Sequence, residues 1–166
     1  MTDDDVSRVL QLNEDHVELL SPLDPARLAD LRGWASRADV IECDGQSAGF
    51  VLVFGPGTEY DSLNYRWFGE RFGDRFHYLD RIVIDDRFRR RGLASAVYDV
   101  VEEGASAHDR LVLEVNIDPP NDPSLAFHRQ RGYTEVGRLG PRGHEVSLMA
   151  KRISDESTRP NVTSGG

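Results

Sequence analysis

What this sequence lacks excludes several kinds of function. Its 166 residues contain one cysteine, Cys43, so the chain can form neither an intrachain disulfide nor a cysteine-ligated metal cluster. No apolar run is long enough to cross a membrane. The acidic start, MTDDDVSRVL, has none of the apolar stretch of a signal peptide. From these absences we expect a reducing, cytoplasmic setting and no membrane partner.

The charge balance and the missing motifs narrow the range further. Lys151 is the only lysine among 20 basic residues, and the formal net charge of −9 argues against a nucleic-acid partner. The five histidines show no H-x-x-x-H or H-E-x-x-H spacing, so no metal site is predicted. The G-x-x-x-x-G-K-S/T and G-x-G-x-x-G loops of common nucleotide-binding folds are also missing. The length fits one domain with a full core.

The most informative stretch is Tyr78–Val101, which has the pattern of a strand, a loop and a helix. Tyr78–Ile84 is rich in β-forming residues, and its apolar end is typical of a strand buried on both faces. A polar turn then leads through Arg89-Arg90-Arg91-Gly92 into an apolar stripe at helical spacing. The stripe consists of Leu93, Ala94, Val97, Val100 and Val101, and Gly104 is placed to end the helix.

Arg89–Gly92 has the composition of an anion site. The first turn of a helix has N–H groups without intrahelical partners, and the helix dipole favours negative charge there. Gly92 would let the backbone approach a ligand closely, and arginine side chains match phosphate oxygens. The stretch therefore predicts a site for a phosphate or pyrophosphate. A solvated basic turn before an ordinary helix is the alternative.

The remaining patterns predict a mixed α/β fold in the order β-α-α-β-β-β-α-β-α-β-β. Helices are expected after Asn13 and at the pairs Asp24-Pro25 and Asp122-Pro123, each pair supplying an N-cap and a first helical residue. The polar, aperiodic residues 154–166 predict a disordered tail, which leaves 1–153 as the domain. The other expected strands are Val6–Leu12, Val40–Cys43, Ala48–Phe54, Leu111–Val115, Tyr133–Arg138 and Glu145–Lys151.

The segment Thr58–Asp74 is rich in aromatic residues and long for a connection between two strands. One interpretation is a substrate-side loop, in which Tyr60, Asn64 and Tyr65 contact the substrate. The other is a helix whose aromatic side chains belong to the core.

Two motifs resemble the GNAT superfamily of N-acetyltransferases. Arg89-x-x-Gly92-x-Ala94 fits that family's Q/R-x-x-G-x-G/A signature. Further along, Asn121-x-x-Ser124-x-x-Phe127-His128-x-x-x-Gly132-Tyr133 is similar to its pattern N-x-x-A-x-x-L-Y-x-x-x-G-F. With the expected element order, the resemblance covers most of residues 6–151. It implies the GNAT fold, with acetyl-CoA as co-substrate and an amine as acceptor. A homodimer is left open.

The resemblance also implies roles for individual residues. The strand before the arginine loop would pair with the pantetheine arm and supply an N–H donor to the oxyanion, and the loop would bind the pyrophosphate. Asn121 matches an asparagine that contacts the pantetheine arm. The cofactor-binding residues implied in this way are Ile82, Val83, Ile84, Arg89, Arg90, Arg91, Gly92, Leu93, Ala94, Asn121, Ser124 and Phe127.

Proton transfer has several candidates, because an amine that attacks a thioester must lose a proton to a base. Tyr78 and Asp80 share the strand parity of Ile82, so we expect all three to line one face. Glu114 lies on the neighbouring strand. Either carboxylate could instead form a structural pair with an arginine such as Arg81.

His128 stands where the family usually has a tyrosine near the cofactor sulfur. Transfer of a proton from an imidazolium, with a pKa of about 6.5, to a thiolate, with a pKa of about 8.5, is downhill. We therefore expect His128 to act as a general acid or sulfur-side donor, with a packed histidine beside Phe127 as the alternative. The missing tyrosine also keeps open a second function, a non-catalytic acyl-CoA-binding or regulatory module, beside that of an N-acetyltransferase.

Overall fold

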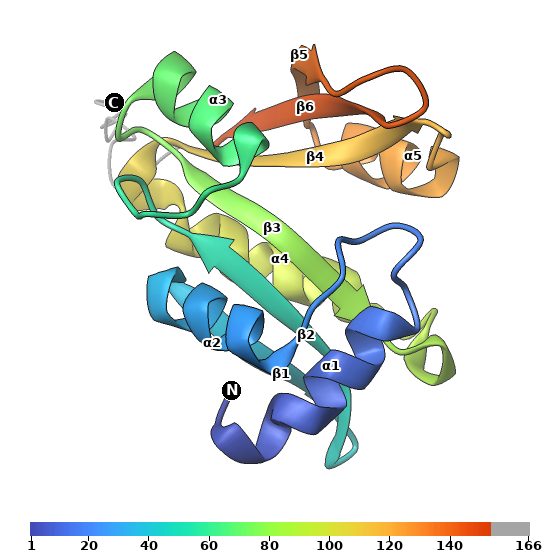
Figure 1. Cartoon of the computed structure of the whole chain (residues 1–166). Helices are drawn as coiled ribbons and strands as arrows, with labels where there is room; N and C mark the ends of the chain where they lie inside the picture. Colours follow the sequence, from blue (N-terminus) through green and yellow to red (C-terminus); the bar gives the residue numbers. More distant parts are fainter. Residues whose placement is uncertain (154–166) are drawn as a thin grey trace, which may run out of the picture.

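The structure, a computed structural model, describes residues 1–153 and contains one six-stranded mixed sheet in the order β1-β2-β3-β4-β6-β5 (Figure 1). The β3–β4 pair is parallel, and the other neighbours are antiparallel. The predicted mixed α/β class is confirmed, whereas the expected tail, 154–166, lies outside the described residues. The strands are β1 (Arg37–Cys43), β2 (Gln46–Phe54), β3 (His77–Ile84), β4 (Arg110–Asp118), β5 (Thr134–Leu139) and β6 (Glu145–Arg152).

Helices cover both faces of the sheet (Figure 1). Helices α1 (Val6–Glu14), α2 (Pro25–Trp34) and α3 (Leu63–Phe72) pack on one face. Helices α4 (Leu93–Gly104) and α5 (Asp122–Gln130) pack on the other. Over residues 1–153, no helix has both the length and the apolar character needed to span a membrane.

Helix α1 replaces the strand expected over Val6–Leu12, so that prediction is wrong and the sheet has one strand fewer. Val9, Leu12 and Asn13 are buried, and their spacing of three and four residues follows a helix rather than a strand. The short helix expected after Asn13 is a series of turns, in which Leu19 is 52% exposed.

The predicted turn and capping signals mostly hold. The hairpin between β1 and β2 is present, and the Asp24 carboxylate accepts a hydrogen bond from the Arg27 N–H at the start of α2 (2.7 Å). Helix α5 differs by one residue, because Asn121 rather than Asp122 is its N-cap and accepts from the Ser124 N–H.

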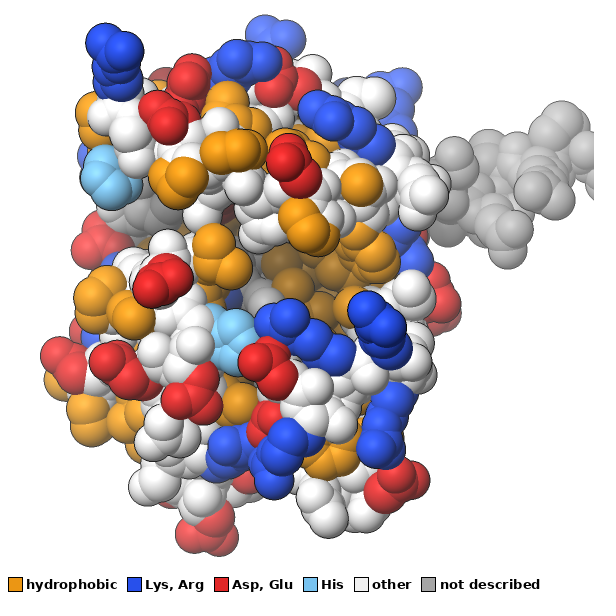
Figure 2. All heavy atoms as spheres, turned by 90° about the vertical axis from the view of Figure 1, so that its right-hand side faces the viewer, with side chains coloured by type: hydrophobic (Ala, Val, Ile, Leu, Met, Phe, Trp, Pro, Cys, Tyr) orange, Lys and Arg blue, Asp and Glu red, His pale blue; other side chains and the backbone are white. Residues whose placement is uncertain are grey.

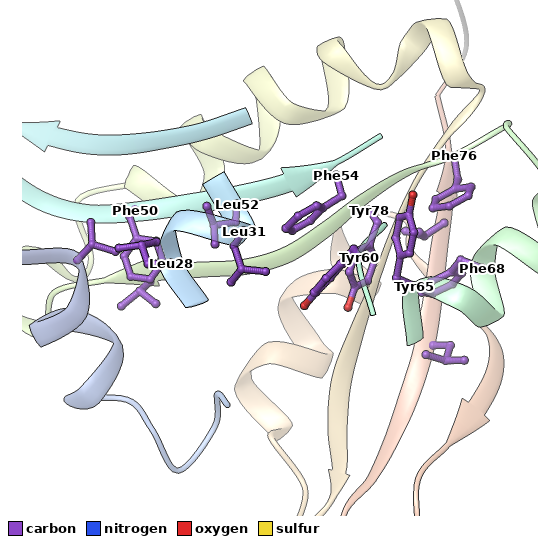
Figure 3. Packing of buried hydrophobic residues seen from close by; sticks show 14 of the residues in the cluster. Leu28, Leu31, Phe50, Leu52, Phe54, Tyr60, Tyr65, Phe68, Phe76 and Tyr78 are labelled. Carbon is purple, nitrogen blue, oxygen red and sulfur yellow. The ribbon is translucent and has the colours of Figure 1, made fainter. Parts of the chain in front are cut away.

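Aromatic side chains form the centre of the core between the sheet and α3 (Figure 3). Tyr60 stacks on Phe54 at 4.3 Å between ring centroids, and Tyr65 packs against Phe76 and Tyr78. The connection 58–74 is thus held to the sheet by its own aromatic residues, which fixes the position of α3.

Strands β3 and β4 are paired at one end and separate beyond it, which leaves an opening in the sheet. They pair at only two positions, His77 with Leu111 and Tyr78 with Val112. Beyond these pairs the two strands diverge toward the right of Figure 1. The edge of β3 that faces β4 therefore has backbone groups without a strand partner within the described chain.

A β-bulge at Asp80 reorients β3 where the opening begins. The register between β2 and β3 shifts by one residue, which leaves Asp80 without a partner of its own. Tyr78 packs on the α1–α3 face of the sheet, whereas Ile82 packs against the α4–α5 face. The prediction that Tyr78, Asp80 and Ile82 line one face is therefore wrong, because the bulge breaks the alternation of side chains.

Candidate active site

A cavity of about 420 Å³ lies in the opening between β3 and β4. The face that carries this opening is hollowed, with hydrophobic side chains inside the hollow and basic side chains along its lower edge (Figure 2). The predicted residues Ile82, Val83 and Ile84 line it from β3, and Glu114 lines it from β4. Because several polar side chains converge there among apolar ones, we treat this cavity as the candidate active site.

A second cavity of about 330 Å³ adjoins the first at the start of α4, since Ile84 and Arg89 line both. Gly92 is the N-cap of α4 in the left-handed conformation (φ 75°), which favours glycine. The N–H groups of the first helical turn lie at this cavity, and they have no intrahelical partners. The other predicted residues that line it are Arg90, Leu93 and Ala94. These features fit a phosphate or pyrophosphate group.

The arginines of the loop differ in their surroundings. Arg89 pairs with Asp86 at 2.8 Å and lies at both cavities. Arg91 pairs with Asp44 at 3.0 Å and lines neither cavity. Arg90 lies at the second cavity, with a φ of 61°. Of the three predicted phosphate ligands, Arg89 and Arg90 are therefore the ones at the groove.

The α5 motif lies on the opposite side of the main cavity. Asn121, Ser124 and His128 line that cavity. Phe127 does not line it, and its ring packs edge-on against Tyr98 at 5.2 Å. Asn121 also caps α5 through its side-chain oxygen, so its amide nitrogen is the atom left for a ligand.

His128 is buried and bonded at both ring nitrogens. Its Nδ1 lies 2.7 Å from the Ser124 carbonyl oxygen, which can only accept, so Nδ1 carries a proton. In the neutral ring Nε2 is then an acceptor, and the Tyr98 hydroxyl donates to it at 2.5 Å. Burial lowers the pKa of His128, with a smaller opposing effect of the Ser124 bond. At neutral pH the ring therefore has no acidic proton, and the two protons of the pair are donated to the Ser124 carbonyl and to Nε2.

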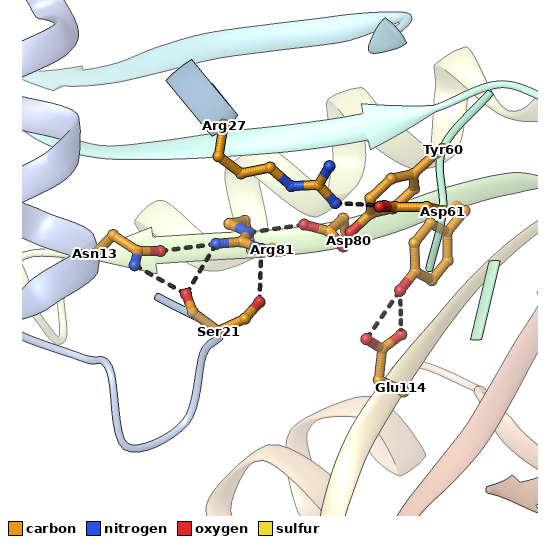
Figure 4. A network of polar contacts seen from close by, with 9 residues as sticks. Asn13, Ser21, Arg27, Tyr60, Asp61, Asp80, Arg81 and Glu114 are labelled. Carbon is orange, nitrogen blue, oxygen red and sulfur yellow. Dashed lines mark hydrogen bonds and ion pairs between the residues drawn. The ribbon is translucent and has the colours of Figure 1, made fainter. Parts of the chain in front are cut away.

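Glu114 has the surroundings of a general base. It projects from β4 at the cavity, and the Tyr78 hydroxyl donates to its two oxygens at 2.8 and 2.7 Å (Figure 4). Burial and then the neighbouring charge of Asp80 raise the pKa of Glu114 to about 8, against the smaller effects of bonds to Tyr78 and Asn64. A carboxyl group that titrates near neutral pH can accept a proton from an ammonium group and release it again.

Asp80 is bonded through both carboxylate oxygens. The Arg81 Nε donates to one at 2.7 Å and the Tyr60 hydroxyl donates to the other at 2.5 Å. The side chains of Asp80 and Arg81 are each only 5% exposed. The structural pairing with Arg81 that the sequence left open is therefore present for Asp80, and of the two candidate carboxyl groups Glu114 is the one without an arginine partner among the described residues.

The three substrate-binding candidates of the 58–74 segment separate in the structure. Asn64 lines the main cavity from α3. Tyr60 and Tyr65 lie in the core, and the Tyr65 hydroxyl donates to the Gly55 carbonyl at 2.7 Å. Tyr60 and Tyr65 are thus core residues. Of the three candidates, only Asn64 is placed where it could contact a substrate.

Sequence reasoning missed part of the cavity wall. Residues of the connection between α1 and α2 reach it from across the sheet, and no local pattern marks them. Tyr98 was overlooked because the buried face of α4 differs from the expected apolar stripe. Tyr98 is buried there, whereas Val100, which was expected in the stripe, is 47% exposed. The lining residues not predicted include His16, Leu19, Leu20, Ser21, Tyr98 and Asn116.

Comparisons with known proteins agree with this geometry. Residues 8–133 match the family model described as the acetyltransferase (GNAT) family. No curated protein matches the chain. Among solved structures, Ard1 from Thermoplasma volcanium is similar, with a TM-score of 0.72 and 19% identity over 93% of this chain and 95% of the other.

Two further structures share the fold. The ribosomal-protein-alanine N-acetyltransferase from Brucella melitensis has a TM-score of 0.68 and 20% identity, over 92% of this chain and 97% of the other. The ribosomal-protein-S18-alanine N-acetyltransferase from Escherichia coli has a TM-score of 0.65 and 17% identity, over 93% and 92%. The match of the family model over most of its length, together with this fold, shows that the chain belongs to the GNAT acetyltransferase family and is an acyltransferase.

Proposed function

We propose that the chain is an acetyl-CoA-dependent N-acetyltransferase that transfers the acetyl group directly to an amine of a small molecule, amino acid or peptide. The observation that carries the proposal is Glu114, a carboxyl group with a pKa of about 8 in the cavity between β3 and β4. The single cysteine suits a reducing, cytoplasmic setting.

The donor would be held along the groove formed by the two cavities. Arg89, Arg90 and the first-turn N–H groups of α4 would bind its phosphates. The unpaired edge of β3 and the Asn121 amide would bind the pantetheine arm. The bound donor supplies an acetyl group activated as a thioester.

The residues of the chain would then direct proton movement and polarise the carbonyl group. Glu114 accepts the proton that the acceptor amine loses, and Tyr78 holds the Glu114 carboxylate in place. A free N–H of β3 donates to the carbonyl oxygen, where negative charge develops. On the sulfur side, the Tyr98 hydroxyl group, held by His128, lines the cavity, and coenzyme A would leave as the thiolate.

The acceptor is the least defined part of the proposal. Two proteins of similar fold are named for the acetylation of alanine in ribosomal proteins. Peptides with a free amino-terminal alanine therefore belong in the acceptor panel beside amino acids and small amines. The assay would follow free thiol release from acetyl-CoA in the presence of each acceptor.

Donor binding provides the direct test. Calorimetry should show acetyl-CoA binding that weakens with added salt, because salt screens phosphate–arginine contacts. Gly92→Glu should abolish binding, since it adds bulk and negative charge at the second cavity. Gly73→Glu is the matched control, because Gly73 has a similar φ of 65° with nothing within 4 Å of an added Cβ. Equal affinities in a folded Gly92→Glu variant would refute the donor site.

Direct transfer makes a separate prediction. Intact-mass spectra of the protein with acetyl-CoA alone should show no acetyl adduct, and Cys43→Ser should keep full activity. A stable adduct that forms and is discharged by the amine would replace direct transfer with a covalent mechanism.

A further inference from the structure

The guanidinium group of Arg81 joins β3 to Asn13 and Ser21, which lie 68 and 60 positions earlier in the chain (Figure 4). Its Nε donates to Asp80 at 2.7 Å. Its Nη1 donates to the Asn13 side-chain oxygen at 2.8 Å and to the Ser21 carbonyl at 3.4 Å, and its Nη2 donates to the Ser21 hydroxyl at 3.1 Å. A guanidinium fork can satisfy this set of acceptors at once, whereas a lysine ammonium cannot.

Asn13 and Ser21 are the two ends of the segment 14–20, which connects α1 to the chain before α2. Asn13 also donates from its amide nitrogen to the Ser21 carbonyl at 3.1 Å. The ends of this segment are thus held together by one another and by the same guanidinium. The segment itself contains turns and no regular helix or strand over most of its length.

Segment 14–20 forms one wall of the main cavity. His16, Leu19 and Leu20 line that cavity from the α1–α3 face of the sheet, the face on which Tyr78 holds Glu114, whereas α4 and α5 pack on the other face. Leu19 is 52% exposed, so burial contributes little to holding it. His16 also contacts Asp86 at 3.5 Å, which attaches this wall to the turn before α4.

The bulge at Asp80 explains why Arg81 points toward this segment. The extra residue places Arg81 on the α1 side of the sheet, in a position where its side chain is 5% exposed. Asp80 neutralises the buried charge and is itself fixed by the Tyr60 hydroxyl. The strand that would bind the donor is therefore connected to this wall by the hydrogen bonds of one guanidinium group, whose charge Asp80 balances.

From these contacts we propose that Arg81 is a positioning residue that holds segment 14–20 as the acceptor-side wall of the cavity. It sets the affinity for the acceptor amine and leaves donor binding unchanged. The proposal rests on the proposed acetyltransferase function for its kinetic consequence. Its structural consequence, the ordering of segment 14–20, does not depend on that function.

The kinetic test compares Arg81→Lys with wild type. Arg81→Lys should raise the acceptor KM at least about tenfold, the effect of losing roughly 1.4 kcal/mol of binding, while kcat and the Kd of acetyl-CoA stay within about twofold. Arg131→Lys is the matched control. Arg131 also bridges helices with several hydrogen bonds, to Glu102 and Asp99, but lies outside the cavity lining. It should lose stability without a change in acceptor KM.

The structural test measures amide hydrogen exchange by mass spectrometry. In Arg81→Lys, amides of residues 14–20 should exchange at least about tenfold faster, and those of α4 should not change. Ser21→Ala removes only the Nη2 acceptor and should give a smaller effect in the same segment. If Arg81→Lys does not fold, Ser21→Ala carries both measurements.

The outcomes separate the two proposals. Wild type that transfers no acetyl group to any amine refutes the proposed function, and exchange then still tests the position of the segment. Unchanged exchange in 14–20 refutes the role of Arg81. Faster exchange with an unchanged acceptor KM in an active enzyme also refutes it, because the segment would then not be the acceptor wall.

Discussion

Replacement of Glu114 by glutamine should remove activity and increase stability at high pH. As a base, Glu114 must be ionised, and a pKa of about 8 leaves about one molecule in eleven ionised at pH 7 and about ten in eleven at pH 9. Wild-type kcat/KM should therefore rise about tenfold between these pH values. Glu114→Gln should lower it by roughly 10²–10⁴-fold and abolish the rise.

The stability effect follows from the same titration. The folded chain binds the Glu114 proton up to about pH 8, whereas the unfolded chain releases it near the ordinary value of 4.5. Between these values the folded state holds more protons, so the free energy of unfolding falls as pH rises. Each pH unit is worth about 1.36 kcal/mol, which sets an upper limit of roughly 5 kcal/mol on the loss.

Urea unfolding at pH 5 and pH 9 would measure this effect. Glu114→Gln should match wild type at pH 5 and exceed its stability at pH 9. The control is Glu102→Gln. Burial acts to raise the pKa of Glu102, but bonds from Arg131, Lys151 and Tyr133 lower it overall. Its stabilisation is present above pH 4.5 and is lost as pH falls, so this variant should be less stable than wild type at pH 9.

Kinetics need an acceptor whose own amine titrates below pH 7, so that its ionisation does not mimic that of Glu114. Three results would refute the reasoning: a flat pH profile, wild-type activity in Glu114→Gln, or equal loss of stability in both variants at pH 9. The last would mean that the Glu114 carboxylate is stabilised in the folded chain rather than strained.

Three other substitutions test the architecture of the site. Tyr65→Ala should lower the free energy of unfolding by about 3–5 kcal/mol, because the side chain is buried; a raised acceptor KM at unchanged stability would instead place Tyr65 at the substrate. Gly49→Ala should destabilise the protein by about 1–3 kcal/mol in urea unfolding, since a Cβ there would lie 2.1 Å from the Val83 carbonyl; wild-type stability would contradict this close approach. His128→Phe removes the acceptor of the Tyr98 hydroxyl, so kcat should fall about tenfold, by the value of one hydrogen bond, with acetyl-CoA affinity kept. Unchanged kcat at saturating substrates would remove the pair from the mechanism.

The loop and helix start at the proposed donor end of the groove could be predicted from the sequence because they are local. The loop from Arg89 to Gly92 and the helix that follows are continuous in the chain, and a left-handed glycine before a helix has a recognisable pattern. Helix starts at Asp24-Pro25 were readable for the same reason. Local chemistry determines each of these features, so neighbouring residues carry the signal.

The cavity wall formed by segment 14–20 could not be predicted from the sequence, because contacts between distant residues hold it in place. Segment 14–20 reaches the cavity through bonds between Asn13, Ser21 and Arg81, residues about 60 positions apart. The strand predicted over Val6–Leu12 shows a related difficulty. Polar and apolar residues alternate weakly over this stretch, which favoured a strand. The positions that are buried against the sheet nevertheless follow helical spacing.

The bulge at Asp80 connects these observations. Strict alternation would have put Tyr78 and Ile82 on one face. One extra residue instead places Tyr78 under Glu114, Ile82 against the α4 side and Arg81 toward α1. The bulge thus sets the directions of Tyr78, which holds the proposed base, of the part of β3 proposed to bind the donor, and of Arg81. Because all three depend on it, a change that removed the bulge would alter donor, acceptor and base together, whereas substitutions in segment 14–20 alter the acceptor side alone.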